Sequence, residues 1–135
     1  MPSQEYDEYE WEAAMAYAKA VNNLDCSMLK PMLAKEAVYE SQHVLNAISG
    51  PSKILKYLKA KFITIGEAVW EMRVRAEMAW MNSTYTGRPA VILHQGEQAV
   101  AVVLFKTESG RITRIDICGV LPRVDEATGT GEFPT

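Results

Sequence analysis

The chain has 135 residues, of which 48% are hydrophobic and 23% charged, and its formal net charge is −3. This length suits one domain that buries about two-thirds of its unfolded surface, and the composition excludes the disordered and membrane classes. So small a net charge gives no sign of a nucleic-acid partner.

The N-terminal residues are acidic and lack the basic stretch and apolar run of a secretion signal. No stretch approaches the ~20 apolar residues of a membrane span. Cys26 and Cys118 lie too far apart for a zinc or redox motif, and there is no cluster of ligating residues around the two histidines. We therefore expect a cytoplasmic protein with no metal, no cofactor and no membrane partner.

Three N-terminal helices are predicted. Apolar residues recur at helical spacing from residue 4 to residue 23. Asp25 suits the N-cap of a short second helix, which Pro31 would kink or end. A third helix is expected over 51–66, because Pro51 suits the first helical position and Gly66 suits the end.

Between the second and third helices, residues 37–48 read "AVYESQHVLNAI", which is too short and too rich in β-forming residues for a helix. This segment is predicted to be a small strand or hairpin. Side chains alternate between the faces of a strand, so Tyr39, Ser41 and His43 share one face and Glu40 lies on the other.

Strong alternation with a period of two begins after residue 66 and predicts a long strand over 68–80. Three further strands are expected over 88–96, 98–108 and 111–120, separated by short turns. The prediction is an α+β domain over residues 1–121, with three N-terminal helices packed on a curved antiparallel sheet made of a four-stranded meander plus a short hairpin. Such a cone has an open end that suits a small molecule, and residues 122–135 are expected to form a flexible C-terminal tail.

One predicted strand, "AVAVVLF" over 99–105, is apolar on both faces. An antiparallel sheet with one face in water normally alternates apolar and polar residues. A second copy of the chain would cover the outer face of this strand, so a homodimer through the sheet is expected.

Three segments carry a family resemblance: "YAKAVNNLD" at 17–25, "LAKEAVYES" at 33–41 and "ESGRITRID" at 108–116. With the order of elements, they resemble the nuclear transport factor 2-like (NTF2-like) superfamily over roughly residues 5–120, and its SnoaL-like and ketosteroid isomerase-like branches most. The resemblance implies a cone-shaped fold that hosts enzymes, ligand carriers and dimerisation modules alike.

Ketosteroid isomerase-like enzymes use a tyrosine on the first helix, a carboxylate base after the second helix and a second acid on the sheet. The resemblance places Tyr17 at the tyrosine, but the base position falls on Ser41 and the second acid near Val102 or Val103. Two of the three groups are absent, and a serine hydroxyl does not ionise near neutral pH without an activator. Classical ketosteroid isomerase chemistry is therefore not expected, and whether the chain is an enzyme stays open.

Two carboxylates are candidates for acid–base catalysis. Glu40 is one residue from the base position, and a β-bulge would turn it inward. Asp116 stands inside the apolar strand "TRIDICG", where burial would raise its pKa and suit it to proton transfer. The alternative for Asp116, which we favour, is an ion pair behind the sheet with Arg73 or Arg75.

The leading hypothesis is a domain that binds a small apolar or aromatic molecule in an apolar pocket. Whether it also carries acid–base chemistry of an isomerase or hydrolase type stays open. The expected ligand-binding residues are Tyr17, Tyr39, Ser41, His43, Trp80 and His94. The rival hypothesis is a non-enzymatic dimerisation or protein-interaction module, in which side chains fill the cone.

Overall fold

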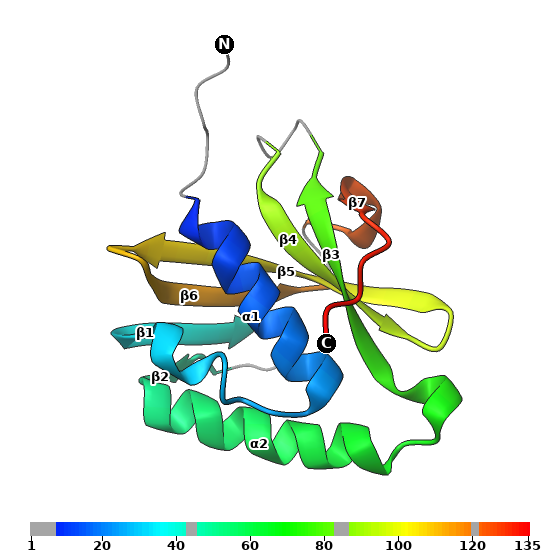
Figure 1. The fold of residues 1–135 in the computed structure, drawn as a ribbon, viewed down its shortest axis with the longest axis horizontal. Helices are drawn as coiled ribbons and strands as arrows, with labels where there is room; N and C mark the ends of the chain where they lie inside the picture. Colours follow the sequence, from blue (N-terminus) through cyan, green and yellow to red (C-terminus); the bar gives the residue numbers. More distant parts are fainter. Residues whose placement is uncertain (1–7, 43–45, 83–86, 120–121) are drawn as a thin grey trace.

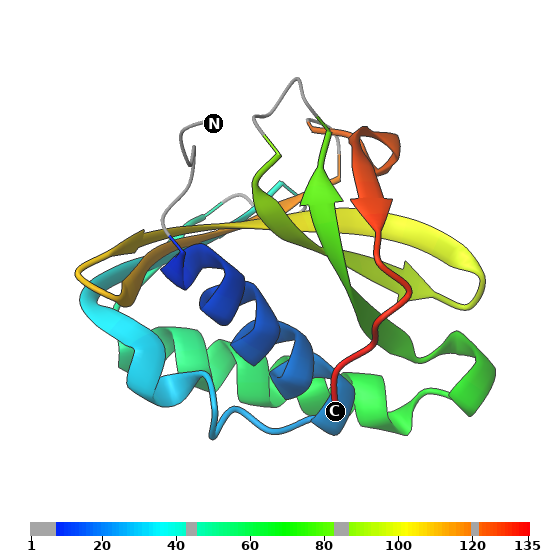
Figure 2. The same ribbon diagram turned by 45° about the horizontal axis from the view of Figure 1, so that its top comes forward.

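The structure is a computed structural model that describes residues 8–42, 46–82, 87–119 and 122–135. Two α-helices, α1 (Tyr9–Asn23) and α2 (Pro51–Glu67), lie on one side of a seven-stranded sheet, as Figures 1 and 2 show. The described residues also form three short 3-10 helices, η1 (Lys30–Met32), η2 (Trp70–Met72) and η4 (Val124–Glu126). The prediction of three helices is wrong by one.

The expected second helix is replaced by turns between α1 and η1. Leu24 adopts a left-handed conformation (φ 55°), and its N–H donates to the carbonyls of Ala20 and Val21, which ends α1 sharply. The carboxylate of Asp25 accepts from the backbone N–H of Ser27 at 2.9 Å, and also from the Ser27 hydroxyl. Asp25 therefore caps a turn two residues long rather than a helix, and Pro31 falls inside η1.

Helix α2 starts where the sequence predicts and ends one residue later than expected. Gly50 precedes it with φ 92°, a conformation that glycine tolerates, and Pro51 occupies the first helical position. Ile54, Leu58 and Phe62 lie on its buried face. Helical spacing thus decides which side of α2 packs on the sheet.

The sheet contains β1 (Leu33–Ser41), β2 (Ile48–Ser49), β3 (Val74–Met81), β4 (Pro89–Gln95), β5 (Gln98–Glu108), β6 (Arg111–Cys118) and β7 (Ala127–Gly129). Their order is β2-β1-β6-β5-β4-β3-β7. The pairing from β3 to β6 is antiparallel throughout, whereas β1 pairs with β6 in parallel. The sheet is therefore mixed and larger than predicted, since the long connection from β1 to β6 permits a parallel pairing.

Strand β3 is shorter than the alternation suggests. The predicted strand begins at residue 68, but η2 occupies 70–72 and β3 starts at Val74. Trp70 and Met72, which the alternation places in the core, are 70% and 49% exposed. Alternation identifies the face of a strand only where the chain is extended.

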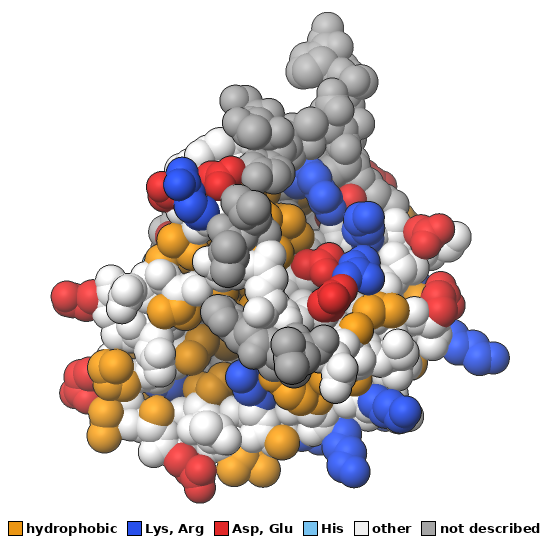
Figure 3. Space-filling view, turned by 180° about the vertical axis from the view of Figure 1, so that it is seen from behind, with side chains coloured by type: hydrophobic (Ala, Val, Ile, Leu, Met, Phe, Trp, Pro, Cys, Tyr) orange, Lys and Arg blue, Asp and Glu red, His pale blue; other side chains and the backbone are white. Residues whose placement is uncertain are grey.

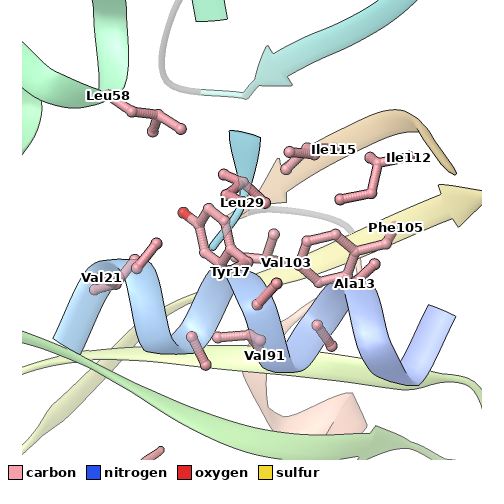
Figure 4. Packing of buried hydrophobic residues seen from close by; sticks show 14 of the residues in the cluster. Ala13, Tyr17, Val21, Leu29, Leu58, Val91, Val103, Phe105, Ile112 and Ile115 are labelled. Atoms are coloured by element: carbon pink, nitrogen blue, oxygen red, sulfur yellow. The ribbon is translucent and has the colours of Figure 1, made fainter. Parts of the chain in front are cut away.

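The main core lies between the two helices and the inner face of the sheet. Figure 4 shows Tyr17 and Val21 of α1 packed against Val91, Val103 and Phe105 of the central strands. Trp11 stacks on Trp80 at a centroid distance of 4.9 Å, closer to the start of α1. This packing fixes α1 across the sheet and leaves space beside α2.

A second apolar cluster lies on the outer face of the sheet. Val102 is fully buried there, and Ala127 of β7 packs against the same cluster, which also includes Ala79, Met81, Ala90, Ile92 and Cys118. The chain itself therefore covers part of the face for which a second copy was predicted.

Residues 122–135, predicted as a flexible tail, run along the opposite edge of the sheet from β2. β7 pairs with β3, and the side-chain amide of Asn22 donates to the carbonyl of Pro134 at 2.7 Å. Phe133 lies 4.7 Å from the guanidinium of Arg75 and 5.7 Å from the ring of His94. This segment is in contact with both α1 and the sheet.

Candidate functional site

A cavity of about 300 Å³ lies between α1, α2 and the inner face of the sheet. Buried residues such as Tyr17, Leu58 and Ile117 line its inner part, whereas the exposed Lys61 and Val100 lie at its opening. The remaining lining residues are Val21, Tyr39, Ser41, Tyr57, Phe62, Ile65, Val74, Leu93 and Ala101. The wall is mainly apolar with a few polar groups, which is the usual make-up of a small-molecule site.

Tyr17 and Tyr39 bring their hydroxyl groups together at this cavity. The phenols are hydrogen-bonded to each other, and this bond lowers the pKa of Tyr17 and raises that of Tyr39, as expected when Tyr39 donates and Tyr17 accepts. Figure 4 shows the Tyr17 hydroxyl turned away from α1 toward the side of Leu58. The Tyr17 hydroxyl therefore lies at the cavity wall beside that of Tyr39.

Burial is the main cause of the pKa shifts of these two tyrosines. Their exposed fractions are 3% and 5%, and desolvation raises the pKa of both phenols well above the ordinary value of 10. Tyr57 adds a third ring, with its centroid 5.3 Å from that of Tyr39. The phenols therefore remain neutral at physiological pH and act as hydrogen-bond donors rather than bases.

Ser41 and Glu40 point to opposite sides of β1. The buried Ser41 lines the cavity, whereas the Glu40 carboxylate accepts a hydrogen bond from the Arg114 guanidinium and is half exposed. β1 does have an irregular register, but it lies between Leu33 and Val38 and leaves Glu40 facing outward. The inward position at the end of this strand is held by serine.

Asp116 also lies on the outer face of the sheet. Its carboxylate accepts three hydrogen bonds from the Arg114 guanidinium at 3.0 to 3.2 Å, so the pair forms within β6. The predicted partners were different: Arg73 instead donates to the carbonyl of Gly66, and Arg75 lies over the ring of Phe133. Figure 3 shows acidic and basic side chains side by side on this face, which is turned away from α1.

The other predicted ligand-binding residues lie away from the cavity or outside the described residues. His94 is on the outer face, where its Nε2 lies 2.8 Å from Glu77. Trp80 is on the inner face but packs on Trp11 and is absent from the lining residues. His43 lies outside the described residues.

Tyr57 and Lys61 line the cavity but were missed by the sequence analysis. Both belong to α2, where each directly precedes an apolar lining residue, Leu58 or Phe62. Their helical spacing with these apolar residues is the signal that could have identified them, because residues three and four apart share one side of a helix.

The described residues do not form a metal-binding site. No group of three or more His, Cys, Asp or Glu residues is arranged there to hold an ion. Cys26 and Cys118 are both free and buried, and burial raises the pKa of each thiol, that of Cys118 to about 11. No helix among these residues combines the length and apolar character needed to cross a bilayer.

Comparisons with known proteins find similarity in structure rather than in sequence. No family model matches the chain, and no curated protein matches it either. A SnoaL-like protein of unknown function from Burkholderia thailandensis is 10% identical, with a TM-score of 0.62 over 87% of this chain and 99% of that chain.

Two enzymes are among the similar structures. A steroid delta-isomerase from Pseudomonas aeruginosa is 16% identical, with a TM-score of 0.58 over 86% of this chain and 82% of that chain. An LEH-like epoxide hydrolase from M. tuberculosis is 20% identical, with a TM-score of 0.50 over 82% of this chain and 81% of that chain. At such identities the likeness establishes a shared fold, and residue roles have to be argued from this chain's own geometry.

Proposed function

Because this chain has the NTF2-like fold, we propose that it binds a small, mostly apolar molecule between α1, α2 and the sheet. The observation that carries the proposal is the cavity of about 300 Å³ with the Tyr17 and Tyr39 hydroxyls on its wall. Apolar residues would enclose the body of the ligand, and Tyr17 would donate a hydrogen bond to an oxygen on it. Ser41 supplies a further polar contact.

The volume of the cavity limits the size of this ligand. A protein cavity of ~150 Å³ accommodates benzene, so the volume here corresponds to about two aromatic rings. A bicyclic or similarly compact molecule therefore fits within the walls, whereas a larger one would extend through the opening.

Acid–base catalysis by Glu40 or Asp116 finds little support in this geometry. A general base must come within hydrogen-bond reach of the proton that it removes. Both carboxylates lie on the outer face and are paired with Arg114, with the sheet between them and Tyr17. Among the described residues, those that line the cavity include no carboxylate. The proposal is therefore ligand binding, with donor hydrogen bonds that favour negative charge on a ligand oxygen.

Calorimetric titration with 2-naphthol, which is bicyclic and neutral at pH 7, tests the proposal. We expect binding to the unmodified protein and a loss of at least tenfold in affinity for Ala101→Leu, because Ala101 is buried on the cavity wall and a larger side chain fills the space. Ala60→Leu changes an exposed position of α2 and is the matched control. Equal affinity in all three proteins would place the binding elsewhere and refute the proposal.

We propose separately that the chain forms a homodimer through the sheet, although less apolar surface is left for a partner than the sequence suggested. Val102 is already buried within one chain, but Leu104 on the same outer face is half-buried and leaves apolar surface to a partner. Light scattering at micromolar concentration tests it. A monomeric mass there would contradict the dimer and leave the ligand-binding proposal untouched.

A further inference from the structure

Lys61 gives the opening of the cavity a positive charge. Of the described residues that line the cavity, Lys61 alone has a charged side chain. Its Nζ lies 5.8 Å from the centroid of the Tyr57 ring, which itself lines the cavity. This cation–π contact holds the ammonium group near the wall, although the residue is exposed.

The surroundings of Lys61 leave this charge uncompensated. No ion pair to Lys61 occurs among the described residues. Helix α2 carries four lysines and a single acid, Glu67 at its C-terminal end, and Lys59 precedes Lys61 by two positions. The potential at the opening is therefore positive, and the apolar wall beside it limits screening by water.

The two ends of the cavity thus differ in character. The inner end presents neutral phenols as hydrogen-bond donors, and the outer end presents an ammonium group. The described residues of the wall include no carboxylate, so they offer no partner to a cationic ligand.

We infer that the cavity selects a compact apolar molecule with a carboxylate at the end nearest the opening, where Lys61 pairs with it. This inference rests on the proposed function and narrows it to a class of ligand. It makes Lys61 a determinant of specificity, while the apolar wall supplies most of the affinity.

A comparison of 2-naphthoate with its neutral amide, 2-naphthamide, tests the inference. The two ligands have nearly the same shape, so a difference in their affinities reports the contribution of the negative charge. Partly exposed ion pairs correspond to roughly two- to fivefold in affinity. In calorimetric titrations at low salt we expect 2-naphthoate to bind the unmodified protein about two- to fivefold more tightly than 2-naphthamide. This ratio should fall toward one in 0.5 M salt, where the charges are screened.

Variants of α2 then identify the residue that causes the preference for 2-naphthoate. Lys61→Gln should bring the ratio to about one, and Lys61→Arg should preserve the ratio. Lys59→Gln removes a charge from the same helix at a position that does not line the cavity, so it is the matched control and should preserve most of the ratio.

The possible results distinguish failure of this inference from failure of the proposed function. Equal binding of the two ligands to the unmodified protein, or a ratio that survives Lys61→Gln, overturns the inference and leaves the proposed function standing. Failure of both ligands and of 2-naphthol to bind overturns the proposed function as well. Thermal unfolding of each variant, compared with the unmodified protein, confirms that the fold is intact.

Discussion

Tyr17 is the residue on which ligand binding depends most directly. Tyr17→Phe removes the hydroxyl that faces the cavity and leaves the Tyr39 hydroxyl without its acceptor. One hydrogen bond contributes about 0.5 to 1.5 kcal/mol, so we expect the affinity for 2-naphthol to fall by ~3- to 10-fold in calorimetry. Tyr9→Phe, at the exposed start of α1, is the control. An unchanged affinity in Tyr17→Phe would remove this hydroxyl from the site.

The raised pKa values of Tyr17 and Tyr39 predict a loss of stability in alkali. In the unfolded chain both phenols ionise near pH 10, whereas in the folded protein burial keeps them protonated above that pH. Their contribution is fully present below pH 10 and is lost as the pH rises from there toward the folded pKa, by about 1.4 kcal/mol per pH unit for each group.

Tyrosine absorbance near 295 nm and urea denaturation between pH 8 and 11 measure this effect. We expect two of the six tyrosines to resist ionisation until the protein unfolds. Ionisation of all six near pH 10 in the folded protein would show that Tyr17 and Tyr39 are accessible to water.

Substitution of Glu40 should lower the stability of the protein slightly and leave its ligand affinity unchanged. Glu40→Gln weakens the pair with Arg114 on the outer face, and because this pair is partly exposed the free energy of unfolding should fall by about 1 kcal/mol or less. The affinity for 2-naphthol should not change. Denaturant titration and calorimetry check the two expectations, and a large loss of affinity would imply that Glu40 reaches the cavity in the ligand-bound state.

At the scale of elements, Asn22 joins α1, β3 and the C-terminal segment. Its side chain donates to the carbonyls of Ala76 and Pro134 and accepts from the N–H of Ala76, at 2.7 to 2.9 Å. Asn22→Ala removes three hydrogen bonds, so we expect the free energy of unfolding to fall by about 2 kcal/mol. Asn23→Ala, at the exposed end of the same helix, is the control in denaturant titrations. Equal stability of the two variants would contradict this role.

The elements differ in how well the sequence predicts them, and local signals explain the difference. Pro51, Gly50 and the apolar spacing all favour α2, and its bounds are nearly as predicted. The short helix expected at Asp25 is absent because the same side chain caps a turn equally well, and sequence alone does not distinguish the two uses.

Contacts between segments that are distant in the sequence could not be predicted from it. The parallel pairing of β1 with β6 and the packing of residues 127–135 along β3 depend on tertiary structure, which no local pattern encodes. The same limit applies to the site. Strand alternation placed Tyr39 and Ser41 on one face and Glu40 on the other, whereas the distance of His94 and Trp80 from the cavity depends on how the sheet meets α1.

For the whole molecule, the C-terminal segment is predicted to protect an edge of the sheet. Deleting residues 127–135 removes β7 and exposes the unpaired backbone of β3 together with part of the outer apolar cluster. Open strand edges promote association, so we expect lower thermal stability and concentration-dependent oligomers in light scattering. Glu132→Gln, which retains the segment, is the control. A truncated chain that remains as stable as the full chain and keeps its mass would show that this segment is dispensable.

The parallel pairing of β1 with β6 also has a consequence for the order of folding. Tyr39 and Ser41 reach their places on the cavity wall only when β6 supplies Ile117 beside them, although α2 and the strands β3 to β5 separate β1 from β6 in the sequence. During synthesis, α1, β1 and α2 leave the ribosome well before β6. Contacts between such remote segments slow folding, so the ligand site is expected to be among the last parts to form, and a ligand would act on the completed fold rather than guide its early steps.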